Sequence, residues 1–344
     1  MRNNKNYRDR YEEYEEYEDE EFEEEEYEDE YASPTFGEAV RGFGRFLFKT
    51  ILILLLIVAL ALWGLYSYIF SGYKTTEFTT SKDTLGLSAK APDGGLYHVA
   101  VFGIDVTDGV GRSDCTMILT VDTVNKQLKV SSLLRDSYLP IKDHGNDKLN
   151  HAYAYGGAEL MLHTVNTNFD MDIKEYVVLD FDDVSLLVDA IGGLDIEISE
   201  AEKKEINRLT ADTHTPLDSA GSVHLDGAQI TAYGRIRYID NEIYRTGRQR
   251  KVLQAVLDKL KNTNYLKYPS LMHDFLPQLE SSLEKGELTA LALRALSCDW
   301  SIKEYVLPSD ADEPIGGSYA GYWCWRYDID NAAERWHKFL EEKQ

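Results

Sequence analysis

The most continuous apolar stretch of the chain lies between Lys49 and Lys74, where no charged residue occurs. It is long enough for a helix to cross a hydrocarbon layer about 30 Å thick. A cleaved signal peptide would have a shorter apolar stretch, about 7 to 15 residues, close to the N-terminus. We therefore predict a single transmembrane helix over residues 46–73.

Beyond residue 95 the apolar positions fall into short runs rich in β-branched residues, which alternate with segments of helical spacing. The runs predict strands over 97–104, 116–121, 127–133, 175–181 and 194–198, and the helical spacing predicts helices over 158–169, 183–191 and 249–260. Strands that alternate with helices are typical of an α/β domain whose sheet is covered on both faces. Residues 74–95, rich in Thr, Ser, Lys and Gly, predict a linker or an irregular lead-in strand.

The C-terminal part of the chain predicts further helices over 270–283, 288–296 and 331–340. Between the last two, residues 316–330 are rich in Gly and aromatic residues, a composition that suits either a covering β-hairpin or a glycan-contacting surface. Cys298 and Cys324 could form a disulfide if this region lies outside the membrane, although sequence alone does not bring them together.

The charge of the chain is unevenly distributed. The formal net charge is −24, and residues 1–31 contain 16 acidic and 4 basic side chains. This composition predicts a disordered tail over residues 1–45, although recruitment of basic partners or tyrosine phosphorylation remains a second interpretation. The acidic balance argues against a nucleic-acid partner, because phosphate contacts require basic surface.

Basic residues flank the apolar stretch mainly on its N-terminal side. Arg41, Arg45 and Lys49 precede it, and only Lys74 follows closely. This bias predicts a cytoplasmic N-terminus and an extracellular domain from residue 96 to the end of the chain.

Two carboxylates follow or precede predicted strands on either side of a Gly-rich loop. Asp105 ends the first strand and Asp114 directly precedes the second. They could converge on one magnesium ion, since this ion prefers oxygen ligands. They could equally be residues that only cap turns.

Cationic side chains are concentrated in the same domain. They are Arg112, Arg135, Lys148, Arg235, Arg237 and Arg245, followed by Gln249 at the start of the last long helix. If residues 233–238 are extended, Arg235 and Arg237 point to one face. Convergence of these groups on one cleft would form a phosphate-binding site, whereas surface salt bridging would explain each of them singly.

Seven segments that follow the predicted membrane span in the sequence resemble the LytR-CpsA-Psr family of cell-envelope proteins. They are VFGID, GRSDCTMILTVD, SLLRDSYLPI, KLNHAYAYGG, YVVLDFDDVSLLVDAIGGLDIEI, LDGAQITAYGRIRY and RTGRQRKVL. The resemblance extends over residues 96–262. The resemblance implies a three-layer α/β/α domain with a central mixed sheet over residues 96–344. It also implies transfer of a glycopolymer, such as teichoic acid or capsule, from a polyprenyl pyrophosphate carrier to peptidoglycan, with Mg²⁺ as the metal.

The resemblance also assigns roles to individual residues. Asp105 and Asp114 match the acidic positions associated with magnesium and pyrophosphate. The positions that match the family's pyrophosphate-contacting residues are Arg112, Arg135, Lys148, Arg235, Arg237, Arg245 and Gln249. Glu242 stands where the family usually has Asp, so either Glu242 or Asp240 would orient or deprotonate the attacking hydroxyl. Cys115, where the family commonly has Thr, is expected to be a small buried residue.

A polyprenyl substrate requires an apolar pocket, and the predicted helices over 183–191 and 249–260 could line it, although an apolar helical stripe is ordinarily core. Two other functions would use the same cationic cleft. A non-catalytic polyprenyl-phosphate-binding or regulatory protein would bind without turnover, and a pyrophosphate hydrolase would release its product to water.

Overall fold

The computed structural model describes residues 36–77, 79–105, 111–319 and 321–343, with the side chains of residues 36–46 and 265 left out. The predicted acidic tail therefore lies largely outside the described residues, as does most of the Gly-rich loop between Asp105 and Asp114. The chain forms two compact units, Met1–Ala61 and Leu62–Gln344.

The first unit is described only by helix α1 (Phe36–Ile69), which continues into the second unit. Within it, Leu47–Ile69 is long and apolar enough to cross a membrane, with a mean hydropathy of 2.5. Its leucine side chains are exposed, as expected for a helix that faces lipid. The helix begins at Phe36, so helical backbone extends into the segment that the sequence predicts as disordered.

A six-stranded mixed sheet forms the centre of the second unit. Its strand order is β10-β3-β2-β1-β6-β9. The strands are β1 (Leu96–Asp105), β2 (Arg112–Asp122), β3 (Gln127–Leu133), β6 (Glu175–Leu179), β9 (Glu280–Ser281) and β10 (Asp299–Leu307). The pairs β1–β6 and β3–β10 are parallel and the other three are antiparallel. The predicted mixed sheet is confirmed.

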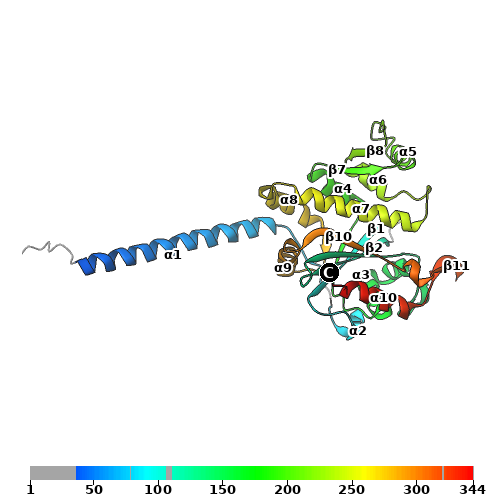
Figure 1. Ribbon diagram of the computed structural model, residues 1–344, viewed down its shortest axis with the longest axis horizontal. Helices are drawn as coiled ribbons and strands as arrows, with labels where there is room; N and C mark the ends of the chain where they lie inside the picture. The colour runs from blue at the N-terminus through cyan, green and yellow to red at the C-terminus, as the bar shows by residue number, and fades with distance from the viewer. Residues whose placement is uncertain (1–35, 78, 106–110, 320, 344) are drawn as a thin grey trace, which may run out of the picture. The chain divides into compact units, whose positions relative to one another are not determined.

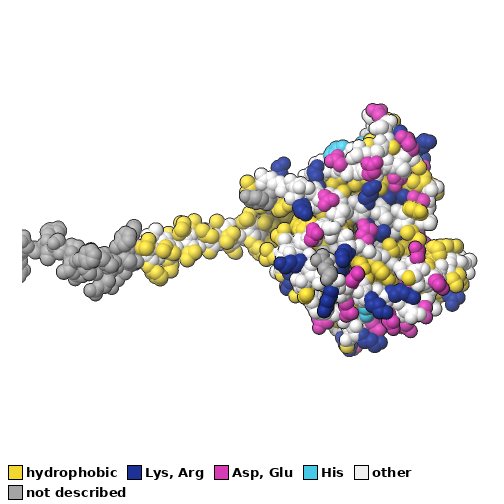
Figure 2. All heavy atoms as spheres, viewed as in Figure 1, with side chains coloured by type: hydrophobic (Ala, Val, Ile, Leu, Met, Phe, Trp, Pro, Cys, Tyr) yellow, Lys and Arg dark blue, Asp and Glu magenta, His cyan; other side chains and the backbone are white. Residues whose placement is uncertain are grey.

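Helices cover both faces of this sheet, which confirms the three-layer architecture (Figure 1). On one face lie α3 (Leu149–Phe169), α10 (Ile329–Glu341) and the short α2 (Lys82–Leu85). On the other lie α4 (Phe181–Ala190), α6 (Gly227–Gly234) and α7 (Glu242–Lys261). Figure 2 shows charged groups of both signs over the surface of the domain.

Polar side chains define where these helices begin. The Asp180 carboxylate accepts a hydrogen bond from the Asp183 backbone N–H at the start of α4, and Asp183 accepts one from the Asp180 N–H in return. Asp226 and Gln229 form the same reciprocal arrangement at α6. Such capping boxes satisfy backbone donors that a helix leaves free at its first turn.

The C-terminal helix α10 is attached to the sheet by buried polar contacts. The Lys129 ammonium lies 2.9 Å from Asp122 and donates to the Leu340 carbonyl at 2.6 Å. The Trp336 indole N–H donates to the Ser131 hydroxyl at 2.7 Å. Because a buried charge is tolerated only when it is paired and hydrogen-bonded, these contacts fix the position of α10 on the sheet.

Several predicted elements differ from the observed ones. Residues 194–198 form a strand, β7, but it pairs with β8 (Gly221–Leu225) in a separate two-stranded sheet beside α5 (Glu200–Leu209). The helix predicted over 270–283 is wrong: α8 (Tyr268–Phe275) ends early, and η3 (Leu276–Gln278) and β9 follow. Pro277 explains the break, since proline supplies no backbone donor.

Three other segments complete the comparison. Helix α9 (Lys285–Leu296) and the hairpin of β11 (Ile315–Tyr319) and β12 (Tyr322–Arg326) occur where the sequence predicts a helix and a hairpin. In the predicted linker 74–95, Leu85 is fully buried in the main core. Cys298 and Cys324 are free, so the disulfide that the sequence allowed is not formed.

His98 of β1 makes the folded domain sensitive to acid. Its Nδ1 lies 2.8 Å from the Thr120 hydroxyl, and burial lowers its pKa from 6.5 to about 4. Between pH 6.5 and 4 the unfolded chain therefore binds a proton at His98 that the folded chain does not bind. The free energy of unfolding carries no penalty from His98 above pH 6.5 and decreases as the pH falls toward 4. We expect this loss to reach about 3 kcal/mol in the wild type and to be much smaller in His98→Gln.

The measurement is urea unfolding of the full chain in detergent micelles, followed by tryptophan fluorescence between pH 7 and 4. His224→Gln is the control, because His224 is exposed and its loss should leave the pH dependence unchanged. Parallel curves for wild type and His98→Gln would show that another group controls the acid sensitivity.

Candidate functional site

Asp105 and Asp114 lie on the neighbouring antiparallel strands β1 and β2 in the middle of the sheet, at the same end of these strands. The pairing runs Gly103↔Cys115 and then Ile104↔Ser113, so Asp114 is the extra residue of a β-bulge. A bulge redirects the side chain of its extra residue, which explains how Asp114 leaves the regular alternation of β2.

Three arginines from distant parts of the sequence meet at Asp114. Arg135, just after β3, donates from Nη1 to Asp114 Oδ1 at 2.6 Å, and Arg237, after α6, pairs with Oδ2. Arg245 of α7 donates from Nη2 to the Asp114 backbone carbonyl at 2.8 Å. The Arg245 side chain is only 3% exposed, whereas that of Arg237 is 44% exposed and accessible to a ligand.

Glu242 joins this arginine cluster from the first turn of α7. Its carboxylate pairs with Arg245 and lies 3.4 Å from Arg135 Nε. Asp240, the other residue that the sequence suggested for this place, instead pairs with Arg248 at 2.6 Å. The structure therefore places Glu242 in the cluster and Asp240 outside it.

The pKa values of the two carboxylates in the cluster, Asp114 and Glu242, are shifted in opposite directions. Burial alone would raise the pKa of Asp114, but the positive charges of Arg135, Arg245 and Arg237 together outweigh burial and lower it. Burial raises the pKa of Glu242, and Arg245 and Arg135 offset this only in part. Asp114 is therefore the more firmly ionised of the two, and Glu242 the better proton acceptor near neutral pH.

Arg235 and Arg237 reach the site without an extended segment, so the condition under which both would point to one face is not met. Arg235 caps α6 in a helical conformation, and Ile236 between the two arginines is buried. Arg235 Nη2 lies 3.9 Å from Asp105, and its guanidinium stacks 4.4 Å from the Phe181 ring centroid. The turn sends the two arginines to the two different carboxylates.

Asp136 is a site residue that the sequence reasoning missed. It accepts a hydrogen bond from Lys148 Nζ at 2.8 Å and lies 3.7 Å from Arg135 Nε. It therefore links Lys148, which ends β5 (Gly145–Lys148) after its pairing with β4 (Tyr138–Ile141), to the arginine cluster. Its place directly after Arg135 in the sequence was the available signal.

Two further predicted residues lie around the cluster. Arg112 is exposed and stands opposite Asp105 in the strand pairing. Gln249 is half-buried on α7, and its buried Oε1 has no hydrogen-bond partner among the described residues. His151 Nδ1 lies 2.9 Å from Asp147.

An apolar cavity of about 190 Å³ opens beside Asp114 and Gln249. Its walls come from β1, β2, α4, α6 and α7 and include Val101, Met117, Val184, Leu187, Ile230, Val252, Leu253 and Val256. The predicted helices over 183–191 and 249–260 therefore both line it, and α6 is the wall that the sequence did not indicate. Cys115 lies in the same wall, where burial raises the pKa of its thiol to about 12 and keeps it neutral.

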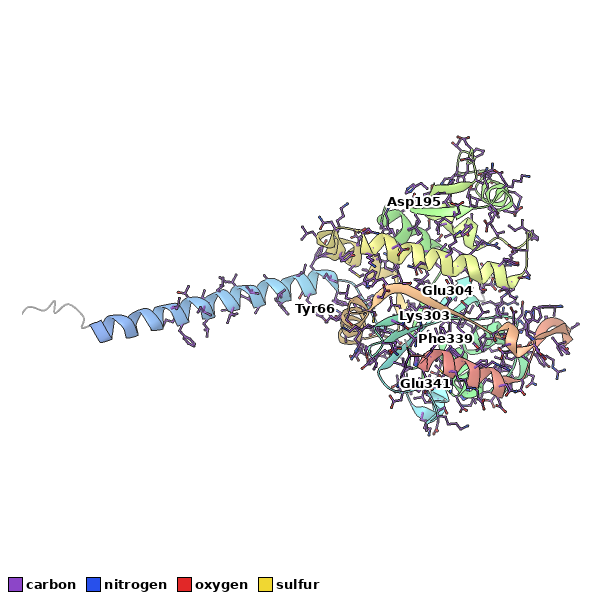
Figure 3. All side chains as sticks on the ribbon, in the orientation of Figure 1. Tyr66, Asp195, Lys303, Glu304, Phe339 and Glu341 are labelled. Atoms are coloured by element: carbon purple, nitrogen blue, oxygen red, sulfur yellow. The ribbon has the colours of Figure 1, made fainter. Side chains whose placement is uncertain are left out.

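An ion pair and a hydrogen bond hold the cavity helix α7 against the sheet. Arg250 donates from Nε to Glu304 of β10 at 2.6 Å. Figure 3 labels Glu304 on this strand. Arg250 also donates to the Ser132 hydroxyl of β3 at 3.2 Å. Arg245, Glu242 and the α7 part of the apolar wall thus belong to a helix that is held against the sheet.

Asp105 and Asp114 offer the type of oxygen donor that a magnesium site completed by a substrate would use. Among the residues that the structure describes, no group of three His, Cys, Asp or Glu side chains could hold a metal alone. Magnesium, however, is usually bound by one or two carboxylates together with substrate phosphates. Two carboxylates on neighbouring strands meet that requirement.

Asp114 is expected to stabilise the fold as well as the site. In Asp114→Asn the buried guanidinium groups of Arg135 and Arg245 lose their shared counter-charge, so we expect a loss of about 2 to 4 kcal/mol in the free energy of unfolding. Asp170→Asn is the matched control, since Asp170 pairs with the exposed Lys90 and should cost less than about 1 kcal/mol. Urea unfolding of the full chain in detergent measures both, and equal losses would contradict the central role of Asp114.

Comparison with known proteins agrees with this fold. The LytR_cpsA_psr family model matches residues 66–340. The polyisoprenyl-teichoic acid–peptidoglycan teichoic acid transferase TagU of Enterococcus faecalis is 30% identical over 292 residues, covering 80% of this chain and 92% of that protein. The TagU of Bacillus mycoides is 28% identical over 285 residues, covering 79% and 89%.

Solved structures show the same architecture. TagT bound to LIIa-WTA superposes with a TM-score of 0.62 at 26% identity, covering 74% of this chain and 95% of that one. The crystal structure of B. subtilis TagT gives a TM-score of 0.60 at 25% identity with the same coverage. Since the family model matches most of the sequence and a relative at 30% identity is covered over nearly its whole length, the chain belongs to the LytR-CpsA-Psr family.

Proposed function

We propose that this protein is a membrane-anchored phosphotransferase that moves a glycopolymer from a polyprenyl pyrophosphate carrier to peptidoglycan. The observation that carries the proposal is the junction of the arginine cluster with the apolar cavity at Asp114. A diphosphate joined to an isoprenoid chain has the same two parts, an anionic head and an apolar tail. The transferase names of the TagU relatives and the complex of TagT with LIIa-WTA support the proposal.

The arginines would bind the diphosphate. Arg237 and Arg235 are the more exposed cations, and their ion pairs with Asp114 and Asp105 can be exchanged for phosphate oxygens. Arg135 and Arg245 are held more firmly by Glu242 and Asp114, so they keep their positions when the substrate arrives. Fixed cations aimed at developing phosphate charge stabilise a phosphoryl-transfer transition state.

The reaction would exchange one phosphorus–oxygen bond for another. A peptidoglycan hydroxyl oxygen attacks the phosphorus that carries the glycopolymer, and the bond from that phosphorus to the bridging oxygen breaks. The leaving group is polyprenyl phosphate, whose new negative charge Arg135 neutralises. Glu242, with its raised pKa, accepts the proton of the attacking hydroxyl.

Asp105 and Asp114 would hold the magnesium ion expected for this family. When bound, the ion would neutralise charge on the diphosphate oxygens. Asp114 would then contact arginine and metal together, so its low pKa serves both contacts.

The remaining parts of the chain fit a membrane-confined donor. We assign residues 1–45 to a cytoplasmic acidic tail, 46–73 to the membrane span, 74–95 to the connection and 96–344 to an extracellular catalytic domain. Arg41, Arg45 and Lys49 before the span support this orientation. A site tethered to the membrane meets a lipid-bound donor at raised effective concentration.

The direct test is a transfer assay with the full chain in nanodiscs, a polyprenyl pyrophosphate-linked glycopolymer, peptidoglycan oligomers and magnesium. We expect magnesium-dependent transfer to peptidoglycan with release of polyprenyl phosphate. Arg135→Lys should lower turnover about 100- to 1,000-fold, because lysine cannot reproduce the fixed guanidinium fork. Glu242→Gln should remove the fall in rate at acidic pH together with most of the activity.

Arg208→Lys is the matched control, since Arg208 pairs with Glu205 on the surface of α5 and should leave turnover unchanged. Transfer that does not depend on Arg135 would contradict the assigned site. Tight binding of the donor without transfer would identify a non-catalytic binding protein, and release of the glycan to water without acceptor would identify a hydrolase.

The cavity predicts a dependence on the length of the lipid. Val184→Trp places a large ring in the apolar space between α4 and α7 and should raise KM for a long-chain polyprenyl donor about tenfold or more. A donor with a very short isoprenoid chain should retain its KM. Leu209→Trp, at an exposed position of α5, is the control, and an equal effect on both donors would place the lipid elsewhere.

A further inference from the structure

The C-terminal end of α1 is packed against helix α8. The Tyr68 ring stacks on the His273 ring with centroids 4.2 Å apart, and His273 Nδ1 lies 2.8 Å from the Tyr68 carbonyl oxygen. Just beyond, Phe70, Tyr73 and Leu276 form a small buried cluster. All of these residues belong to the second unit, so α8 lies directly beside the last turn of the membrane-spanning helix (Figure 1).

The chain that follows α1 is also fixed to the domain. The Tyr73 hydroxyl donates to the Leu283 carbonyl at 2.7 Å, and the Thr76 N–H donates to the Ser281 carbonyl at 2.9 Å. Lys285 Nζ donates to the Phe70 carbonyl at 3.3 Å. The surface around α8 therefore lies where the chain leaves the bilayer, without a free linker between them.

The residues that lead into α8 carry a local excess of positive charge. The segment Lys259–His273, here called the α8 segment, contains three lysines and no Asp or Glu and lies between Asp258 and Asp274, in a chain of net charge −24. Lys261 and Lys267 are exposed. Leu266 is 73% exposed and Met272 is 40% exposed. Exposed apolar side chains among lysines are typical of a surface that lies in a lipid headgroup layer.

We propose that the α8 segment is a membrane-docking surface, in which Leu266 and Met272 enter the lipid leaflet beside α1 and Lys261 and Lys267 contact anionic headgroups. This inference needs the membrane span but not the transferase activity. Its occupant is a bilayer surface because the α8 segment is continuous with the end of the span and opposite in charge to anionic lipid.

The docking surface also reaches the apolar cavity through the opposite face of α8. Leu271 packs against the cluster that contains Val188, Val256 and Leu260. Val256 lines the cavity. One short helix thus separates the proposed lipid contact from the cavity wall, which places the cavity close to the membrane surface.

The test is lipid quenching of a fluorophore on the full chain in nanodiscs that contain anionic lipid. An NBD group is attached at Leu266→Cys, and labelled wild type supplies the background of the native cysteines, of which Cys298 and Cys324 are buried. We expect blue-shifted emission that nitroxide-labelled lipids quench about twofold or more. Ile315→Cys is the control, since Ile315 is 67% exposed on β11, at the other end of the domain from α8 (Figure 1).

The charge contribution is tested on the same labelled protein. Lys261→Glu combined with Lys267→Glu should reduce quenching at the Leu266 label, whereas Lys90→Glu combined with Lys338→Glu, at exposed lysines elsewhere, should not. Quenching no stronger than at Ile315 would overturn the proposal. A blue shift without lipid quenching would also overturn it, because it would indicate contact with protein instead of lipid.

Discussion

The negative charge of Asp114 holds the candidate site together. Three guanidinium groups converge on this one residue, two on its carboxylate and one on its backbone carbonyl. They come from distant parts of the sequence, since Arg135 and Arg237 are about a hundred residues apart. Without that carboxylate, the mutual repulsion of Arg135, Arg237 and Arg245 would oppose closure of α7 over the sheet. The β-bulge is the feature of the backbone that places the carboxylate at their meeting point.

The two faces of the sheet have different roles because they are filled differently. On the face of α3 and α10, large side chains such as Phe102, Phe169 and Trp336 are almost completely buried. On the face of α4, α6 and α7, the mainly aliphatic side chains leave the cavity open. One face therefore stabilises the domain, and the other is available for an apolar ligand beside the arginines.

Much of this arrangement could be predicted from the sequence, for a definite reason. Asp105, Asp114 and Arg135 lie at strand ends, and strand ends that share a sheet edge come together whatever the details of packing. Arg235 and Arg237 could not be placed in the same way, since their positions depend on how α6 ends, and the chain there turns instead of extending. The choice between Glu242 and Asp240 depended on which of them forms an ion pair with Arg248. This is a tertiary contact that the local sequence does not indicate.

The opposite pKa shifts of Asp114 and Glu242 explain how two carboxylates at one arginine cluster can have different roles. Both are largely buried, so desolvation acts on both in the same direction. Asp114 faces three arginines and stays ionised, which suits a residue that keeps three cations in place. Glu242 also lies near Asp136, whose negative charge adds to burial and raises its pKa further. A phosphate bound by Arg135 would bring further negative charge near Glu242 and raise that pKa again, so donor binding itself would make Glu242 a stronger base.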